Sequence, residues 1–341
     1  MRRRLFAALS ALLAWTTGAF AFEIEAETTF PAATATVELR IISTADSAFF
    51  TPAVLDFQAA HANIAVTYVE ASSTEAVKAI SEGASFDLIV SSAMDLQTKL
   101  ANDGFATVIR SSATSAVPEW AKWRDSVFAF TQEPATLVLS PTAFDGLPVP
   151  ETRKALIEIL REHPDRFRGR IGTYDIRQSG LGYLFATQDS RTSETYWRLT
   201  EVMGGLATQL YCCSLNMIEA VRSGELALAY NVLGSYARLP TVKTDDLVVI
   251  ELADYTATMQ RSILMLRNSE NPDAARLFVD HLLSTAWSTS DEPAFGFSAE
   301  LDPDDISVNR KPIRLGPGLL VFLDQHKRGQ FQRAWENAIL Q

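Results

Sequence analysis

Three short apolar runs alternate with three amphipathic segments between residues 37 and 104, and this order constrains the fold more than any other feature. The apolar runs are rich in β-branched residues and predict strands at residues 37–42, 64–69 and 86–90. The segments after them begin at Ser, Thr or Asp clusters and predict helices at residues 49–60, 73–80 and 94–100. This order of strands and helices predicts a parallel sheet covered by helices.

A second group of strand and helix patterns follows the turn-rich segment 141–150. It predicts strands at residues 170–175 and 226–230 and helices at residues 151–162, 180–187, 194–203 and 215–222. Further on, the chain returns to strand-like residues 261–266 and to amphipathic helices at residues 274–284 and 329–340. We therefore expect an α/β protein of two lobes, residues 37–136 with 248–341 and residues 137–247.

The N-terminus carries the pattern of a secretory signal peptide over residues 1–21. Arg2, Arg3 and Arg4 precede the apolar run Leu5–Trp15, and Ala19-Phe20-Ala21 supplies small residues for cleavage after Ala21. A membrane anchor is the alternative, but this run is shorter than the ~20 residues that a spanning helix needs. We expect a soluble mature protein in the periplasm.

The chain is acidic, with a formal net charge of −11 that becomes −14 when the three arginines of residues 1–21 are removed. Such a charge disfavours binding to nucleic acid or to an anionic membrane surface. It does not exclude a small anionic ligand, because a few oriented N–H groups can bind an anion against the net charge. We expect a monomer with a small-molecule ligand and no nucleic-acid partner.

The two cysteines, Cys212 and Cys213, are adjacent in the sequence. Their spacing suits neither a disulfide framework nor a zinc site. Two free, half-buried thiols and a vicinal disulfide both stay open, the latter because the periplasm is oxidising. In either state we expect little effect on ligand affinity, since the pair adds no charge.

Three predicted strand ends lead into helices through small hydroxyl-bearing residues or glycine. These pairs are Ser43-Thr44, Ser91-Ser92 and Ser179-Gly180. Ligands of open α/β sheets bind at the carboxyl ends of the strands, where helix N-termini present free N–H groups. The three pairs therefore predict an anion site, although each pair alone is also explained by helix capping.

Four further residues near strand ends are candidate ligand contacts. Arg177 precedes Ser179 in the same loop and has a guanidinium that could hold a phosphate or carboxylate. Asp175, Tyr230 and Asn231 could bind hydroxyl or amine groups. The alternatives are an exposed surface arginine and turn residues that bond only locally.

The sequence offers no catalytic constellation. The four histidines, His61, His163, His281 and His326, lie in predicted helices or at helix ends, away from the serine-bearing loops. We find no serine elbow, paired acids or metal-ligand spacing, and we expect neither an enzyme nor a bound metal or cofactor.

Several segments of the chain resemble family 1 extracellular solute-binding proteins, and within them the group of the periplasmic regulator of phosphoglycerate transport. The resemblance rests on residues 87–97, 169–175, 179–183 and 227–236. It implies a class II periplasmic binding-protein fold, with two lobes, two crossovers and the ligand between them. It also implies kinship with iron(III)-binding and hexose-phosphate-binding proteins. The iron-binding relatives carry an adjacent tyrosine pair where this chain has Asn231 to Tyr236 without one.

These observations predict a periplasmic protein that captures a small anionic, phosphorylated organic metabolite. The resemblance implies delivery to an ABC permease or to a membrane sensor kinase. Binding of a ferric ion or a carboxylate by the same fold is the first alternative. A secreted hydrolase is the second.

Overall fold

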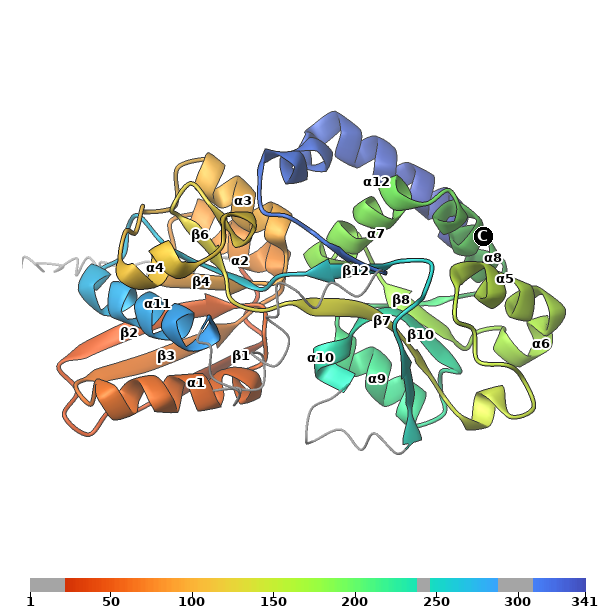
Figure 1. The fold of residues 1–341 in the computed structure, drawn as a ribbon, viewed down its shortest axis with the longest axis horizontal. Helices are drawn as coiled ribbons and strands as arrows, with labels where there is room; N and C mark the ends of the chain where they lie inside the picture. The colour runs from red at the N-terminus through yellow and green to blue at the C-terminus, as the bar shows by residue number, and fades with distance from the viewer. Residues whose placement is uncertain (1–21, 238–245, 288–308) are drawn as a thin grey trace, which may run out of the picture.

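A computed structural model describes residues 22–237, 246–287 and 309–341 (Figure 1). The predicted signal peptide, residues 1–21, lies outside the described residues. Within those ranges, no helix is both long enough and apolar enough to cross a membrane. The described chain forms two α/β lobes, each built around its own sheet.

The first lobe contains a sheet of seven described strands in the order β1-β3-β2-β4-β13-β6-β5. Their bounds are Ala26–Phe30 for β1, Val37–Ser43 for β2, Ile64–Glu70 for β3, Leu88–Ser91 for β4, Lys122–Trp123 for β5, Val127–Ala129 for β6 and Ser262–Met265 for β13. β2 pairs in parallel with β3 and β4, as the repeated strand and helix pattern predicts. β13 comes from far along the chain and pairs antiparallel with β4 and β6. The polar pattern of β1, at the sheet edge, carried no strand prediction.

Helices cover both faces of the first sheet (Figure 1). They are α1 (Ser47–Ala60), α2 (Ser73–Ser81), α3 (Met94–Asn102), α4 (Ser112–Ala116) and α11 (Pro272–Ala286), with a 3-10 turn η1 at Glu119–Ala121. α1 and α11 bury apolar residues against each other, and the rings of Phe57 and Phe278 meet edge to face with centroids 5.0 Å apart. The predicted helices of this lobe are confirmed, with ends shifted by a few residues.

The second lobe contains a sheet in the order β14-β12-β7-β10-β8-β9, with β11 also paired to β7. The strands are β7 (Glu133–Leu139), β8 (Ile171–Tyr174), β9 (Gln209–Tyr211), β10 (Leu228–Leu233), β11 (Val248–Ile250), β12 (Thr256–Met259) and β14 (Arg310–Pro312). β8 lies between β9 and β10 and is parallel to both. The carboxyl ends of β8 and β9 therefore lie at one edge of the sheet.

The helices of the second lobe include the C-terminal one. They are α5 (Arg153–Glu162), α6 (Pro164–Phe167), α7 (Gly180–Thr192), α8 (Thr195–Gly205), α9 (Ser214–Arg222), α10 (Gly234–Ala237) and α12 (Gln325–Ile339), with a 3-10 turn η2 at Thr142–Phe144. A second 3-10 segment, η5 at Pro317–Leu323, precedes α12 and packs on α3 of the first lobe. α12 packs on α8, and its Phe331, Trp335 and Ile339 join the second core. The sequence-based grouping of residues 248–341 with the first lobe thus does not hold for β11, β12, β14 and α12, because hydrophobic periodicity predicts an element but not its partner.

Within the described residues, two short connections carry the chain between the sheets. One joins β6 to β7 and the other joins β12 to β13. A buried ion pair holds them together: Arg261 donates from Nε to Glu133 Oε1 at 3.0 Å and from its NH2 group to Oε2 at 3.1 Å. Burial alone would lower the pKa of Arg261, but Glu133 holds it above its ordinary value. Both ions are therefore paired where the lobes meet.

Candidate functional site

A cavity of about 760 Å³ lies between the two lobes. Its size falls in the range of small-molecule sites. The first lobe lines it with the segment that precedes β1 and with the loops that follow β2, β3 and β4, and the second lobe with the loops that follow β8, β9 and β10. The cavity thus opens where the carboxyl ends of the parallel strands meet, which is the expected position of a ligand in an α/β protein.

Helix α1 begins at this cavity, but the N–H of Ser47 in its first turn already donates to Glu70 Oε1 at 2.9 Å. Among the described elements, four further helices begin at or beside the cavity: α2, α7 and α9 at residues that line it, and α3 just after Ser92, which also lines it. Two of them are capped by serines, since Ser72 Oγ accepts from Glu75 N at 3.2 Å and Ser179 Oγ accepts from Gly182 N at 3.1 Å. The N-cap residues of α3 and α9, Ala93 and Cys213, make no side-chain capping bond within the described chain. All four helix starts carry partial positive charge toward the cavity, from both lobes.

Two of the predicted hydroxyl residues, Thr44 and Ser92, line the cavity together. Thr44 Oγ1 accepts from the N–H of Ser92 at 3.2 Å, so the two loops of the first lobe are held side by side. Ser43 and Ser91 do not line the cavity. Each is buried, and its hydroxyl accepts from the N–H two residues further on, at 3.0 and 3.1 Å. Their role is to close turns after β2 and β4.

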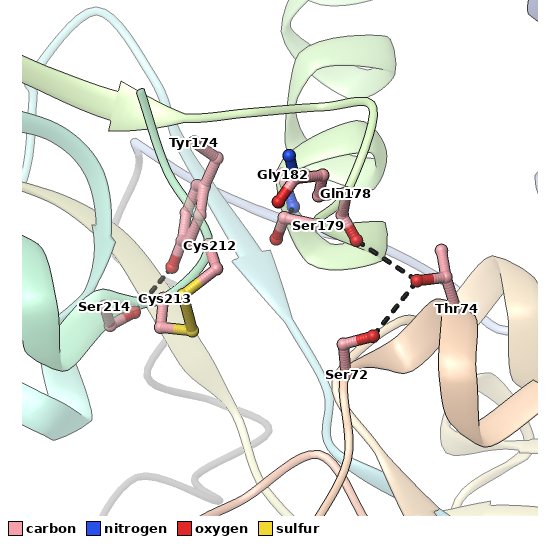
Figure 2. The surroundings of a disulfide bond; sticks show 9 residues. All are labelled: Ser72, Thr74, Tyr174, Gln178, Ser179, Gly182, Cys212, Cys213 and Ser214. Atoms are coloured by element: carbon pink, nitrogen blue, oxygen red, sulfur yellow. Dashed lines mark hydrogen bonds between the residues drawn. A yellow bond between two sulfur atoms is a disulfide. The ribbon is translucent and has the colours of Figure 1, made fainter. Parts of the chain in front are cut away.

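The predicted pair Ser179 and Gly180 divides in the same way. Ser179 lines the cavity, whereas Gly180 contacts the opposite lobe. The N–H of Gly180 donates to Ser73 Oγ at 2.9 Å, and Thr74 Oγ1 donates to the carbonyl of Gln178 at 3.3 Å (Figure 2 draws the second bond). A Cβ atom on Gly180 would lie 2.4 Å from Ser73 Oγ. This close approach of the start of α2 to the start of α7 requires glycine.

Arg177 lines the cavity as an already paired cation. Its Nε donates to Asp175 Oδ1 at 2.8 Å and its NH2 group donates to Oδ2 at 2.7 Å, while Glu336 Oε1 lies 3.9 Å from NH1. Burial would raise the pKa of Asp175, but the hydrogen bonds from Arg177 hold it below its ordinary value. Asp175 is buried and does not line the cavity; it orients the arginine, 40% of whose side chain remains exposed.

Tyr230 and Asn231 lie away from this cavity, in a buried polar cluster of the second lobe. Tyr230 Oη and Asn231 Nδ2 both donate to Asp189 Oδ2, at 2.9 and 2.8 Å, and Arg153 Nε donates to Tyr230 Oη at 2.7 Å. The sequence places the end of the strand at Tyr230, but β10 continues to Leu233. Asn231 sits at an irregularity in that strand with a φ of 63°, and its side chain turns toward Asp189.

The sequence analysis missed an acidic side of the cavity, in the first lobe. Its carboxylates belong to Glu23, Glu25, Asp46, Glu70 and Glu75. Partial burial and the charges of Asp46, Glu70 and Glu23 raise the pKa of Glu25 above its ordinary value. Glu70 ends β3, so the strand-end argument applied to Ser43 and Ser91 could have found it, whereas nothing marked Glu25 in the polar segment before β2.

The arrangement of these groups suits binding better than chemistry. Helix starts and hydroxyls can hold an anion, and the carboxylates can accept from hydroxyl or ammonium groups. Arg177 is the one basic residue among the described residues that line the cavity. Within the described chain, no three His, Cys, Asp or Glu side chains gather as metal ligands.

Comparison with known proteins identifies the class. The model of the bacterial extracellular solute-binding protein family matches residues 39–288. The structure of the substrate-binding protein of an ABC transporter from Agrobacterium tumefaciens is 31% identical, with a TM-score of 0.87 over 94% of this chain and 99% of that one. The chain therefore belongs to the bacterial extracellular solute-binding proteins. None of the curated protein sequences matches it.

More distant structures share the fold. The periplasmic binding protein AfuA from Actinobacillus pleuropneumoniae, with fructose-6-phosphate bound, is 15% identical with a TM-score of 0.73, over 89% of this chain and 99% of that one. Iron-bound HitA from Pseudomonas aeruginosa is 16% identical with a TM-score of 0.63, over the same shares. The expected two-lobed periplasmic binding-protein fold is confirmed. The narrower likeness to the phosphoglycerate regulator stays a prediction.

Proposed function

We propose that this ABC-type solute-binding protein captures a small phosphorylated organic metabolite in the cavity between its lobes. The observation that carries the proposal is the meeting of four helix starts, those of α2, α3, α7 and α9, at one cavity. A helix start contributes about 0.3–1 kcal/mol to the binding of an anion at an exposed position, and more where it is partly buried. Several such contributions, with hydroxyls beside them, are enough to retain one phosphate group.

The hydroxyls nearest these helix starts come from both lobes. Thr44 and Ser92 belong to the first lobe, and Ser179 and Ser214 to the second. A phosphate ester has several acceptor oxygens, so it can accept from N–H and O–H donors of both lobes at once. Such a ligand would hold the lobes together, which is how a two-lobed protein retains its solute.

The acidic side of the cavity limits the rest of the solute. Glu25, Asp46 and Glu70 would repel a second anionic group at that end. They favour hydroxyl or amine substituents, which donate hydrogen bonds to carboxylates. A monophosphate with a hydroxylated or aminated carbon skeleton therefore fits better than a bisphosphate or a polycarboxylate.

The alternatives have less support. The phenolate pair of the iron-binding relatives has no counterpart between Asn231 and Tyr236. A hydrolase would need an activated nucleophile, and the cavity hydroxyls described here are engaged in capping and turn bonds. Delivery to an ABC permease fits the class, whereas delivery to a sensor kinase rests on the sequence resemblance alone.

Matched solutes test the proposal. Purified mature protein is titrated calorimetrically and melted with glycerol 3-phosphate, 3-phosphoglycerate and fructose 6-phosphate, and in parallel with glycerol, glycerate and fructose. At ~100 times its Kd, a phosphate ester should stabilise the protein by about 2.7 kcal/mol, and its unphosphorylated partner should do far less. Ferric citrate and citrate complete the series. Stabilisation by ferric citrate alone, or equal stabilisation by both members of a pair, contradicts the phosphate assignment.

Export is tested separately. The periplasmic fraction of producing cells should contain a chain that begins at Phe22, as cleavage after Ala21 requires. N-terminal sequencing gives the answer, and a chain that begins at Met1 in the membrane fraction would contradict the predicted signal peptide.

A further inference from the structure

Cys212 and Cys213 form a disulfide bond in the connection between β9 and α9, on the wall of the cavity (Figure 2). Cys212 is exposed and Cys213 is half-buried. Cysteine is among the most often buried residue types, so a partly exposed disulfide on the wall of the cavity calls for an explanation. The bond closes a small ring through the peptide between the two residues and restrains the backbone there.

The residues on either side of the disulfide are fixed to the sheet of the second lobe. The carbonyl of Tyr211 accepts from the N–H of Asp175 at 2.8 Å. The hydroxyl of Ser214 bonds Tyr174 Oη at 2.5 Å and accepts from the N–H of Leu233 at 3.3 Å. The two cysteines lie between these anchored residues, and the disulfide restrains their side chains.

The cavity wall around the disulfide differs from the opposite wall. The second lobe contributes to the lining, besides polar groups, the apolar side chains of Leu181, Leu215 and Leu233 and the ring of Tyr236. The first lobe opposes it with carboxylates and hydroxyls, including Ser72 and Thr74 (Figure 2). Disulfide sulfur is apolar and polarisable, so it suits contact with carbon rather than with charged groups.

The disulfide also governs how α9 begins. Cys213 occupies the N-terminal cap position, and in the described chain no side chain accepts a hydrogen bond there. A free serine at this position could fold back and accept from the first turn, as Ser72 and Ser179 do in α2 and α7. With its sulfur bonded to Cys212, Cys213 cannot do so, and the first turn of α9, which lines the cavity, has no side-chain acceptor at its N-cap.

We propose that the Cys212–Cys213 disulfide is part of the solute-binding surface: it fixes residues 212–216 as one wall of the cavity and presents its sulfur atoms to the carbon skeleton of the solute. This inference rests on the proposed function in one respect, that the solute occupies this cavity. It revises the expectation from sequence that the state of the cysteines matters little. The pair adds no charge, but it adds shape and an apolar contact.

Reduction of the bond provides the test, because the chain has only these two cysteines. A trialkylphosphine and water convert the disulfide into two thiols and the phosphine oxide. Hydrogen exchange of residues 212–216 is compared in the oxidised, the reduced and the Cys212→Ser/Cys213→Ser proteins. We expect at least tenfold faster exchange in the latter two, with melting temperatures within a few degrees of the oxidised protein. Unchanged exchange overturns the proposal, and this measurement needs no solute.

Affinity for the phosphate esters named above is then measured in the same three states. We expect about tenfold weaker binding without the disulfide, and no effect of the phosphine on the double variant. Ser223→Ala, at the far end of α9, is the matched control and should bind like the unaltered protein. Equal affinity in all three states overturns the contact with solute. If the oxidised protein binds none of the esters, the proposed solute class fails, and the exchange result alone decides on the disulfide.

Discussion

The backbone N–H of Gly180 donates a hydrogen bond to Ser73 Oγ at 2.9 Å, and this contact joins the start of α7 in one lobe to the start of α2 in the other. It lies beside the cavity, where residues on both sides of it contribute to the lining. The distance between the lobes at this point is therefore set by the smallest side chain on one helix and a hydroxyl on the other.

Gly180→Ala should weaken solute binding by tenfold or more, because its Cβ would meet Ser73 Oγ at 2.4 Å and hold the lobes apart. Small-angle scattering should show a more open molecule, and titration with the phosphate esters should show the lower affinity. Gly205→Ala, whose Cβ would make only an ordinary contact at 3.6 Å, is the control. Normal affinity in Gly180→Ala would mean that the bound state does not need this approach.

Arg177→Ala should weaken binding of a phosphate ester by about tenfold, because a charge-assisted hydrogen bond contributes about 1.5–3 kcal/mol and Asp175 already shares this guanidinium. Arg177→Lys should restore only part of the affinity, since an ammonium cannot bond Asp175 and a ligand through a planar fork. Arg222→Ala, which breaks a similar pair with Glu219 on α9, should leave calorimetric affinity unchanged. Full affinity in Arg177→Ala would assign the anion to the helix starts alone.

Glu25→Gln should tighten the binding of phosphate esters by about two- to threefold, as expected for one carboxylate charge several ångströms away in a solvated cavity. The gain should shrink at high salt, where charge interactions are screened. Glu27→Gln removes the same charge from β1 at a position that does not line the cavity, and it controls for net charge. Weaker binding in Glu25→Gln would show instead that the carboxylate accepts a hydrogen bond from the solute.

Asp95→Asn should stabilise the protein above neutral pH. Asp95 is buried in the first turn of α3, and burial raises its pKa to about 7 against hydrogen bonds from the backbone and the charge of Arg328, which lower it. The folded protein therefore holds a proton that the unfolded chain releases near pH 4, so stability falls as pH rises from about 4 to about 7. The asparagine variant lacks this fall, so at pH 8 its free energy of unfolding should exceed that of the unaltered protein by on the order of a few kcal/mol. Thermal melts from pH 4 to 8 measure this pH dependence of stability, with the exposed Asp273→Asn as the control. Parallel pH profiles for Asp95→Asn and the unaltered protein would contradict the raised pKa of Asp95.

The sequence was sufficient to predict most of the described helices and several residues that line the cavity. Strand and helix periods located the elements around the cavity, and the rule that ligands bind at strand ends led to Thr44, Ser92, Arg177 and Ser179, which line it. The same rule pointed to Tyr230, which does not line the cavity. Strand β10 continues past an irregularity to Leu233, and the sequence pattern does not show this continuation.

The contacts between distant segments could not be predicted in this way. Nothing local indicates that Gly180 would approach Ser73, or that α12 would pack on α8. β1 was not predicted because most of its residues are polar and exposed, so the sequence shows no alternation of apolar and polar residues there. The cysteine pair left two states open, because adjacency alone does not determine whether the bond forms.

The position of β13 has a consequence for the order in which the protein is completed after export. This strand, residues 262–265, lies between β4 and β6 inside the first sheet, and the second sheet in turn includes β12 and β14. Both lobes thus need strands from the last third of the chain, and neither can close its core while that part is still being synthesised or threaded through a membrane. Contacts between such distant residues form slowly. We therefore expect a chain of this topology to complete both sheets only after its C-terminal strands are available, which would favour passage through a membrane before folding.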